Sequence, residues 1–392
     1  MTSTDSHRWN SVLGLYVALA LGAASTLPFV RVAPNRLLSG EPVYLWDIFQ
    51  SQSNQLVLVF FLAVFALLFI AIGQAQRRFL QLMVSFAMAA SLAGLWLLAS
   101  QVSSSLSLSD NPLSRTSLGA GFWVMTAISW LVALDAIDRL NISALPRFIL
   151  QIVLCLPLAL SLTEGQNLSL IKEYANHSDV FGPAIWRHLL IVVLAVVPAV
   201  FIGVPIAWRM TQSEGVKQAL FPILNLIQTI PSIALFGLLM APLAWLAVQW
   251  PTLGKAGISG VGLAPAVLAL LLYSLLPIVR STLAGLEQVP ADTINAARAM
   301  GMSAWQILCQ VELPLALPVL LIGLRTAVVQ TTGLAAVCAL IGAGGLGQIM
   351  FDGLFSAAND LVILGVIPIV LLAMLADSLF KVLGNLLKTS AP

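Results

Sequence analysis

Residues 287 to 314 read EQVPADTINAARAMGMSAWQILCQVELP, a moderately polar stretch between two of the most apolar segments of the chain. After the turn at Pro290, Asp292 and Thr293 each offer a side-chain oxygen that can cap the start of a helix. Asn295 to Met300 is a short run of mostly good helix formers, and Gly301 then stops it. This half of the stretch therefore predicts one short helix that ends at a glycine.

The second half of the same stretch predicts another helical piece, from Ser303 to Val311. Helical spacing there places three side chains on one face, namely Trp305, Leu308 and Cys309. Leu313-Pro314 closes this piece before the next apolar segment begins. The whole stretch therefore predicts two short helices that are bent at Gly301.

The composition of the chain is that of a protein that crosses a membrane many times. Of its 392 residues, 59% are hydrophobic and only 9% are charged, and the mean hydropathy is +0.98. Each crossing needs roughly 20 apolar residues, so the length corresponds to about ten spans. The formal charge of +2 is spread thinly and favours no nucleic-acid partner. We therefore expect an all-α integral membrane fold of about ten transmembrane helices, surrounded by membrane lipid.

The apolar runs fall into two groups of five, separated by a polar segment at 164 to 186. The first block, residues 1 to 163, has runs near 11–31, 55–73, 79–100, 118–138 and 146–163. The second block, residues 187 to 385, has runs near 188–208, 219–244, 260–281, 315–341 and 358–383. Nothing in the sequence assigns a role to the first block.

The lysines and arginines in short loops predict the orientation, because loops that stay in the cytoplasm retain positive charge. With the N-terminus inside, the inside set has twelve members: Arg8, Arg77, Arg78, Arg139, Arg147, Arg209, Lys217, Arg280, Arg298, Arg325, Lys381 and Lys388. The outside set then has six members, which complete the 18: Arg31, Arg36, Arg115, Lys172, Arg187 and Lys255. Both termini and the 287–314 stretch are predicted to be cytoplasmic, and the 164–186 segment is predicted to be extracytoplasmic.

The residues offer little for catalysis. The three histidines, His7, His177 and His188, form no metal pair, and no HExxH or GxSxG motif is present. Gly254-Lys255 is followed by Ala256, so it is not part of a phosphate-binding loop. We therefore expect a transport protein that is not an enzyme, has no catalytic or metal-binding residues, and does not hydrolyse ATP itself.

A few charged residues lie within or near the apolar runs, where a charge costs several kcal/mol, about 3 on insertion scales. Asp135 and Arg139 are four residues apart, as are Asp377 and Lys381, so each two are predicted to pair along one helix. Arg325 leaves two alternatives open. It either lines a pathway through the protein or reaches the cytoplasmic interface.

Proline and glycine interrupt the apolar runs of the second block, as in QTIPSIALFG (228–237) and LIGAGGLGQ (340–348). Such breaks are tolerated where the freed backbone groups face protein or water. They indicate a pathway between helices, for which the candidate residues are Gln228, Pro231, Ser232, Phe236, Tyr273, Pro277, Thr331, Gly342, Gly344 and Gly345. For the two aromatic side chains in this set, a packed core position is the alternative.

The spacing within the opening stretch resembles a known motif. Asn295-Ala296-Ala297, then Gly301 after three residues, then Val311-Glu312-Leu313-Pro314 after nine more, is similar to the EAA-x3-G-x9-I-x-L-P loop of ABC importer permeases. In that family this cytoplasmic loop docks into a cleft of the ATPase subunit. The resemblance implies that ATPase coupling involves Asn295, Ala296, Ala297, Gly301, Val311, Leu313 and Pro314. The family's glutamate is Asn295 here, which puts an ion pair at that point in doubt.

Three further stretches look like permeases for glycine betaine, choline and related osmoprotectants. They are 225–242 (NLIQTIPSIALFGLLMAP), 272–280 (LYSLLPIVR) and 334–347 (LAAVCALIGAGGLG). The resemblance covers roughly residues 181 to 383 and implies a type I importer core, here in a long form with extra N-terminal helices. The alternatives are a permease for methionine or another small amino-acid or organosulfur solute, and an ion-coupled secondary transporter.

The resemblance also implies a location and a set of partners. The location is the bacterial cytoplasmic (inner) membrane. The partners are two ATP-binding subunits that carry ATP and Mg, a second permease chain, identical or related, and an extracytoplasmic substrate-binding protein. No cofactor is expected in this chain.

Overall fold

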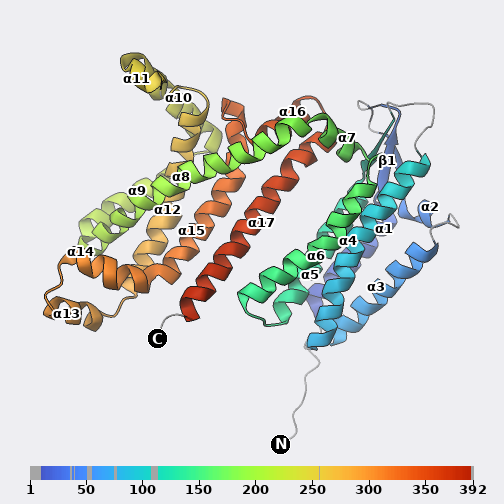
Figure 1. Cartoon of the computed structure of the whole chain (residues 1–392), viewed down its shortest axis with the longest axis horizontal. Coiled ribbons are helices and arrows are strands. Elements are labelled where there is room, and N and C mark those ends of the chain that lie inside the picture. Colours follow the sequence, from blue (N-terminus) through green and yellow to red (C-terminus); the bar gives the residue numbers. More distant parts are fainter. Residues whose placement is uncertain are drawn as a thin grey trace, which may run out of the picture. The chain divides into compact units, whose positions relative to one another are not determined.

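The computed structural model describes residues 10–35, 38, 40–50, 55–74, 77–106, 114–255 and 257–389. Within it the chain divides into two compact units, Met1–Asn176 and His177–Pro392. The division lies inside the 164–186 segment, which is largely helical rather than an extended connection. Figure 1 shows both units in sequence colours, and each is described by itself below.

The first unit is a bundle of apolar helices with a small sheet. Its elements, in order, are α1 (Ser11–Thr26), β1 (Val30–Ala33), β2 (Glu41–Val43), α2 (Leu45–Gln50), α3 (Gln55–Gly73), α4 (Arg78–Leu106), β3 (Arg115–Leu118), α5 (Ala120–Arg139), α6 (Ala144–Ser161), the 3-10 turn η2 (Leu162–Glu164) and α7 (Ser169–Asn176). The core lies between α1, α3, α4 and α5, where side chains such as Val17, Leu68, Val84 and Val132 are buried together.

The three strands form an antiparallel sheet in the order β2-β1-β3. Val30 of β1 pairs with Val43 on one side and with Leu118 on the other. Hydropathy did not predict this sheet, because the strands are short and lie between the apolar runs. Their pairing also joins segments that are far apart in the chain.

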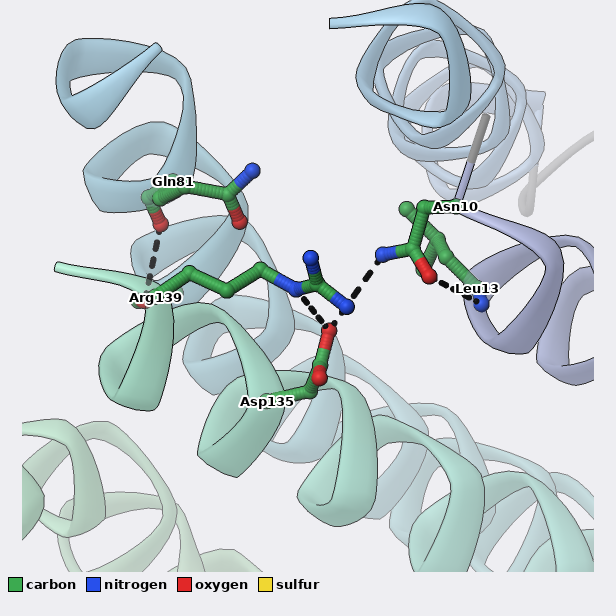
Figure 2. A network of polar contacts seen from close by, with 6 residues as sticks. Asn10, Leu13, Gln81, Asp135 and Arg139 are labelled. Carbon is green, nitrogen blue, oxygen red and sulfur yellow. Dashed lines mark hydrogen bonds and ion pairs between the residues drawn. The ribbon is translucent and has the colours of Figure 1, made fainter. Parts of the chain in front are cut away.

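A polar network ties the start of α1 to the end of α5 in the first unit (Figure 2). The Asn10 side chain accepts a hydrogen bond from the backbone N–H of Leu13 (3.1 Å), which caps α1. The same side chain donates to Asp135 (Nδ2 to Oδ2, 3.4 Å). Arg139 contacts that carboxylate as well (Nε to Oδ2, 2.7 Å), which confirms the predicted pairing along one helix.

The second unit consists of helices joined by short turns and has no strand among its described residues. Its elements are α8 (Ser178–Gln212), α9 (Glu214–Thr229), α10 (Ser232–Gln249), α11 (Pro251–Lys255), α12 (Leu263–Glu287), α13 (Ala291–Ala299), α14 (Ala304–Ile307), the π-helical turn η3 (Leu308–Glu312), α15 (Leu313–Ala335), the 3-10 turn η4 (Val337–Ile341), α16 (Leu346–Phe355) and α17 (Asn359–Thr389). Helix α12 packs against both α8 and α15, and α15 also packs against α17 (Figure 1).

Nine helices of the described residues are long and apolar enough to cross a membrane, against the ten runs expected. The first run, 11–31, yields only the 16-residue α1, because the chain enters β1 at Val30. The run 219–244 is divided between α9 and α10. Ile230 there has an extended backbone (φ −68°, ψ 128°), since the residue before a proline is disfavoured in the helical region.

Candidate functional site

The first short helix of the 287–314 stretch is α13, and it begins earlier than predicted. Pro290 is its N-terminal boundary residue, and the Pro290 carbonyl accepts hydrogen bonds from Thr293 (3.1 Å) and Ile294 (3.4 Å). The prediction that Asp292 or Thr293 caps the helix is therefore wrong. Both lie inside the first turn, where the Asp292 charge still interacts favourably with the helix dipole.

The end of α13 at Gly301 is confirmed. Gly301 has a φ of +81°, the left-handed conformation that glycine adopts without steric cost. Its N–H bonds to the Arg298 carbonyl (2.9 Å), and the Met302 N–H bonds to the Ala297 carbonyl (3.2 Å). These two bonds form a complete Schellman motif, which satisfies carbonyls that the helix would otherwise leave unpaired.

The second helical piece starts as predicted and ends differently. Ser303 and Gln306 form a reciprocal capping box (2.8 and 3.4 Å) at the start of α14. The helix then continues through η3 directly into α15, so the prediction that Leu313-Pro314 closes the element is wrong. The Leu313 N–H bonds to the Leu308 carbonyl, and Pro314 follows where this wider turn returns to α-helix. A missing N–H is tolerated at that position.

The residues of the resemblance are unequally exposed. Asn295, Ala296, Gly301 and Pro314 are exposed, Val311 and Leu313 are half-buried, and Ala297 is buried. Of the three side chains predicted to share one face, only Leu308 is buried; Cys309 is exposed and Trp305 is 61% exposed. Trp305 packs against Trp208 of α8 (ring centroids 6.1 Å apart).

Met300 is the residue of this surface that sequence reasoning missed, and it is 76% exposed. A large apolar side chain directly before the glycine of a polar stretch was the available signal. Together with Trp305 it gives the turn between α13 and α14 an apolar exposed surface.

The break between α9 and α10 is held by α12. Gln228 donates to the Tyr273 carbonyl (Nε2 to O, 2.9 Å), and the Tyr273 hydroxyl donates to the Ile230 carbonyl. The helical backbone is interrupted here, between the end of α9 and the start of α10. Pro231 at this break is exposed, and Ser232 is half-buried. Three of the candidate pathway residues, Gln228, Tyr273 and Pro231, therefore meet at one point.

Further polar contacts continue from this point across the bundle. Thr331 of α15 and Ser274 of α12 share a hydrogen bond between their hydroxyls (2.8 Å). On the next residue of α15, the Thr332 carbonyl contacts His188 Nε2 of α8 (3.0 Å). We call Gln228, Tyr273, Ser274, Thr331, Thr332 and His188 the polar seam. It joins α8, α9, α12 and α15 inside the apolar bundle.

Two candidate pathway residues serve packing. Phe236 is completely buried in the cluster that includes Leu270 and Ala335, so its position is that of a core aromatic. Pro277 is half-buried inside α12, and its carbonyl lies 2.5 Å from where a Cβ on Gly323 would sit. Only a glycine allows α15 to approach α12 this closely.

The glycine turn before α16 brings together Gly342, Gly344 and Gly345, whose φ values are +79°, +79° and +84°. Arg187 of α8 donates to the Ala343 carbonyl in this turn (Nε to O, 3.0 Å). Sequence reasoning missed Arg187 and His188 as functional candidates. Their signal was the cationic residue and imidazole side by side where a long apolar helix begins.

Arg325 belongs to an ion network that neither of the two alternatives left open for it had described. Its Nε lies 2.8 Å from Asp377 Oδ1 of α17, and Lys381 Nζ lies 2.8 Å from the other oxygen of the same carboxylate. The predicted pairing of Asp377 with Lys381 is confirmed. Arg325 is held by a partner on the neighbouring helix, so two cations share one carboxylate.

Two family models match the chain, one in each structural unit. Residues 199–389 match the family model described as "Binding-protein-dependent transport system inner membrane component". Residues 8–171 match the model described as "ABC transporter permease YehY, N-terminal domain". The two matches together account for most of both structural units.

Curated relatives match about half of this chain and most of their own length. The osmoprotectant import permease protein OsmW of Salmonella typhimurium is 42% identical over 207 residues, which are 53% of this chain and 91% of that protein. The carnitine transport permease protein OpuCD of Listeria monocytogenes is 36% identical, over 54% of this chain and 87% of that protein. Among solved structures, an inward facing conformation of the MetNI methionine ABC transporter is 25% identical over 51% of this chain and 94% of that chain, with a TM-score of 0.41.

Proposed function

We propose that this chain, which belongs to the family of binding-protein-dependent transport system inner membrane components, is the permease subunit of an ABC importer. Its substrate is glycine betaine, choline or a related osmoprotectant. The observation that carries the substrate class is the 42% identity across 91% of an osmoprotectant import permease. The chain is the membrane-spanning subunit, and ATP and Mg bind to a separate ATPase.

The coupling surface of this proposal is the turn between α13 and α14. Exposed Asn295, Met300 and Trp305 lie on a segment stabilised by the Schellman motif at Gly301 and by the capping box of α14. A rigid short helix with an apolar exposed side chain at its end suits insertion into a cleft of another protein. Because Asn295 is neutral, contact with the ATPase relies on packing and hydrogen bonds rather than on an ion pair at that residue.

The transmission path of this proposal runs through helix α15. The coupling segment continues without interruption through η3 into α15, so a displacement of the loop moves this helix directly. Helix α15 carries Thr331 and Thr332 of the polar seam, and the seam reaches the break at Pro231. Alternating access requires two states of similar energy that nucleotide binding biases.

The remaining parts of the assembly follow from the same proposal. A second permease chain completes the pathway, and an extracytoplasmic binding protein delivers substrate. Both termini and the coupling surface lie in the cytoplasm, as the distribution of lysine and arginine predicts.

Uptake by intact cells tests the proposal. The chain and its ATPase and binding protein would be expressed in a host that lacks other betaine and choline uptake, and labelled glycine betaine, choline, carnitine and methionine would be offered separately. We expect uptake of at least one quaternary amine, loss of that uptake when the ATPase is inactivated, and copurification of the ATPase with this chain. Uptake of methionine alone, or uptake that persists without the ATPase, would refute it.

A further inference from the structure

The start of α16 has backbone donors without acceptors. Within the part of the chain that the structure describes, the N–H groups of Gly344, Gly345 and Leu346 have no hydrogen-bond acceptor. Gly345 and Leu346 are buried. Nearly all buried backbone donors in proteins are paired, so the two unpaired N–H groups of the buried residues Gly345 and Leu346 indicate a missing acceptor. The positive end of the α16 dipole points the same way.

Arg187 adds a full positive charge at this turn. Its Cγ and Nε lie 3.6 and 4.0 Å from where a Cβ on Gly344 would sit, and its Nε donates to the Ala343 carbonyl. No carboxylate of the described residues forms an ion pair with it. The guanidinium is therefore fixed beside the unpaired backbone donors by an uncharged contact.

His188 is the independent sign that a ligand belongs here. Its side chain is fully buried, and its Nδ1 has no hydrogen-bond partner. The Nδ1 atom lies 3.4 Å from where a Cβ on Gly345 would sit, so it faces the residue that precedes α16. The Thr332 carbonyl on the other side of the ring can only accept, so Nε2 carries a hydrogen. Nδ1 is left to interact with whatever occupies the turn.

We propose that the start of α16, together with Arg187 and His188, binds the carboxylate of a zwitterionic substrate. The backbone donors of Gly344, Gly345 and Leu346 and the guanidinium of Arg187 match the acceptors of a carboxylate. The negative charge of a bound carboxylate would also favour protonation of His188, whose Nδ1 would then donate to it. The inference rests on the proposed function and narrows its substrate class. Glycine betaine and carnitine carry a carboxylate, whereas choline does not.

The position of this carboxylate site suits a first contact in the pathway. Arg187 belongs to the positive charges predicted to lie outside. His188 connects the site to the polar seam through Thr332, and the next residue, Thr331, contacts Ser274 of α12. A substrate held at the start of α16 is therefore adjacent to the helices whose rearrangement opens the pathway.

The test compares two substrates in one importer. Cells that express the full chain with its ATPase and binding protein would be assayed for uptake of labelled glycine betaine and labelled choline. Arg187→Gln should lower betaine uptake about tenfold, the loss of one charge-assisted contact, and leave choline uptake within about twofold. Arg187→Lys should restore much of the betaine uptake. The matched control is Arg209→Gln on the same helix, where an exposed arginine contacts Gln212; it should change neither substrate.

The possible outcomes separate the two proposals. Wild-type uptake of neither compound would refute the proposed function itself. Wild-type uptake of choline without betaine would overturn the carboxylate site alone, and so would an equal loss of both substrates in Arg187→Gln at normal membrane levels. If betaine is the one compound taken up and Arg187→Lys fails to restore its uptake, the carboxylate site would be overturned. Arg187 would then be required for the contact of its guanidinium with the Ala343 carbonyl and not for its positive charge.

Discussion

Replacement of Gly301 by valine should uncouple ATP hydrolysis from transport. Gly301 has a φ of +81°, and no atom outside its chain neighbours lies within 4 Å of where its Cβ would sit. A side chain at this position therefore meets no neighbouring element. The whole effect arises from the backbone conformation, which makes the position a clean test of the turn between α13 and α14.

The magnitude follows from the left-handed conformation. An L-residue in this region costs roughly 1 to 2 kcal/mol, and a β-branched residue lies at the upper end of that range. About 2 kcal/mol lowers the population of the native turn roughly 30-fold relative to alternatives. Helix α13 has only nine residues, too few to be stable by itself. Loss of the Schellman bonds from Gly301 and Met302 would therefore release the whole segment rather than bend it slightly.

The assay is the ATPase rate of the purified complex in vesicles, with and without the substrate-loaded binding protein. Gly301→Val should retain basal ATPase activity and lose its stimulation, with unchanged amounts of the chain in the membrane. Gly301→Asn is the matched control, because asparagine enters the left-handed region with little strain, and it should keep most of the stimulation. Normal stimulation in Gly301→Val, or equal losses in both variants, would refute the reasoning.

Three further predictions concern the contacts inside each unit. Tyr273→Phe removes the donor to the Ile230 carbonyl at the α9–α10 break and should lower the stability of the folded protein by about 0.6 to 1.7 kcal/mol, as found for such bonds between membrane helices. We expect a lower thermal midpoint in detergent and reduced uptake, and an unchanged midpoint would contradict this prediction. Asp377→Asn leaves Arg325 and Lys381 without their carboxylate and should lower the stability of the folded protein by about 1 to 2 kcal/mol, between the values for exposed and buried pairs. The double variant with Arg325→Gln should regain part of this stability, and additive losses would count against the network. Asp135→Asn weakens the contacts of Arg139 and Asn10 (Figure 2) and should raise the rate of hydrogen exchange at the start of α1. The control Asp138→Asn, which disturbs the exposed pair with Arg147, should leave that rate unchanged, and equal exchange in the two variants would refute the role of Asp135.

The membrane-spanning helices could be predicted because their signal is local. A helix in hydrocarbon must satisfy its own backbone hydrogen bonds and present apolar side chains, so hydropathy alone located the run 55–73, which is the extent of α3. The stop at Gly301 was equally local, since the left-handed backbone and the two hydrogen bonds that end the helix involve only residues 297 to 302. The division of the run 219–244 also had a local cause in Pro231, but hydropathy averages over such a break and merged α9 with α10.

The helix boundaries in the coupling stretch show where local rules compete. Asp292 and Thr293 are good capping residues, yet Pro290 already had the extended backbone that starts a helix, and α13 begins directly after it. Pro314 is a good helix breaker, yet the π-helical turn before it removes the hydrogen bond that a proline would break. In both cases two valid signals lay within a few residues of each other, and the backbone geometry of the neighbouring residue decided between them.

The sequence by itself determined that this chain is a helical membrane protein, where most of its spans lie, and that residues 287 to 314 form a bent pair of helical pieces with the spacing of a permease coupling loop. Tertiary structure alone decided which residues of different helices meet. It paired Arg325 with Asp377 on a neighbouring helix, and it set Tyr273 against the break at Pro231. It also placed Arg187 and His188 at the glycine turn before α16. The physical reason is that helix periodicity and hydropathy depend on residues a few positions apart, whereas a contact between helices depends on their packing, which no short stretch encodes.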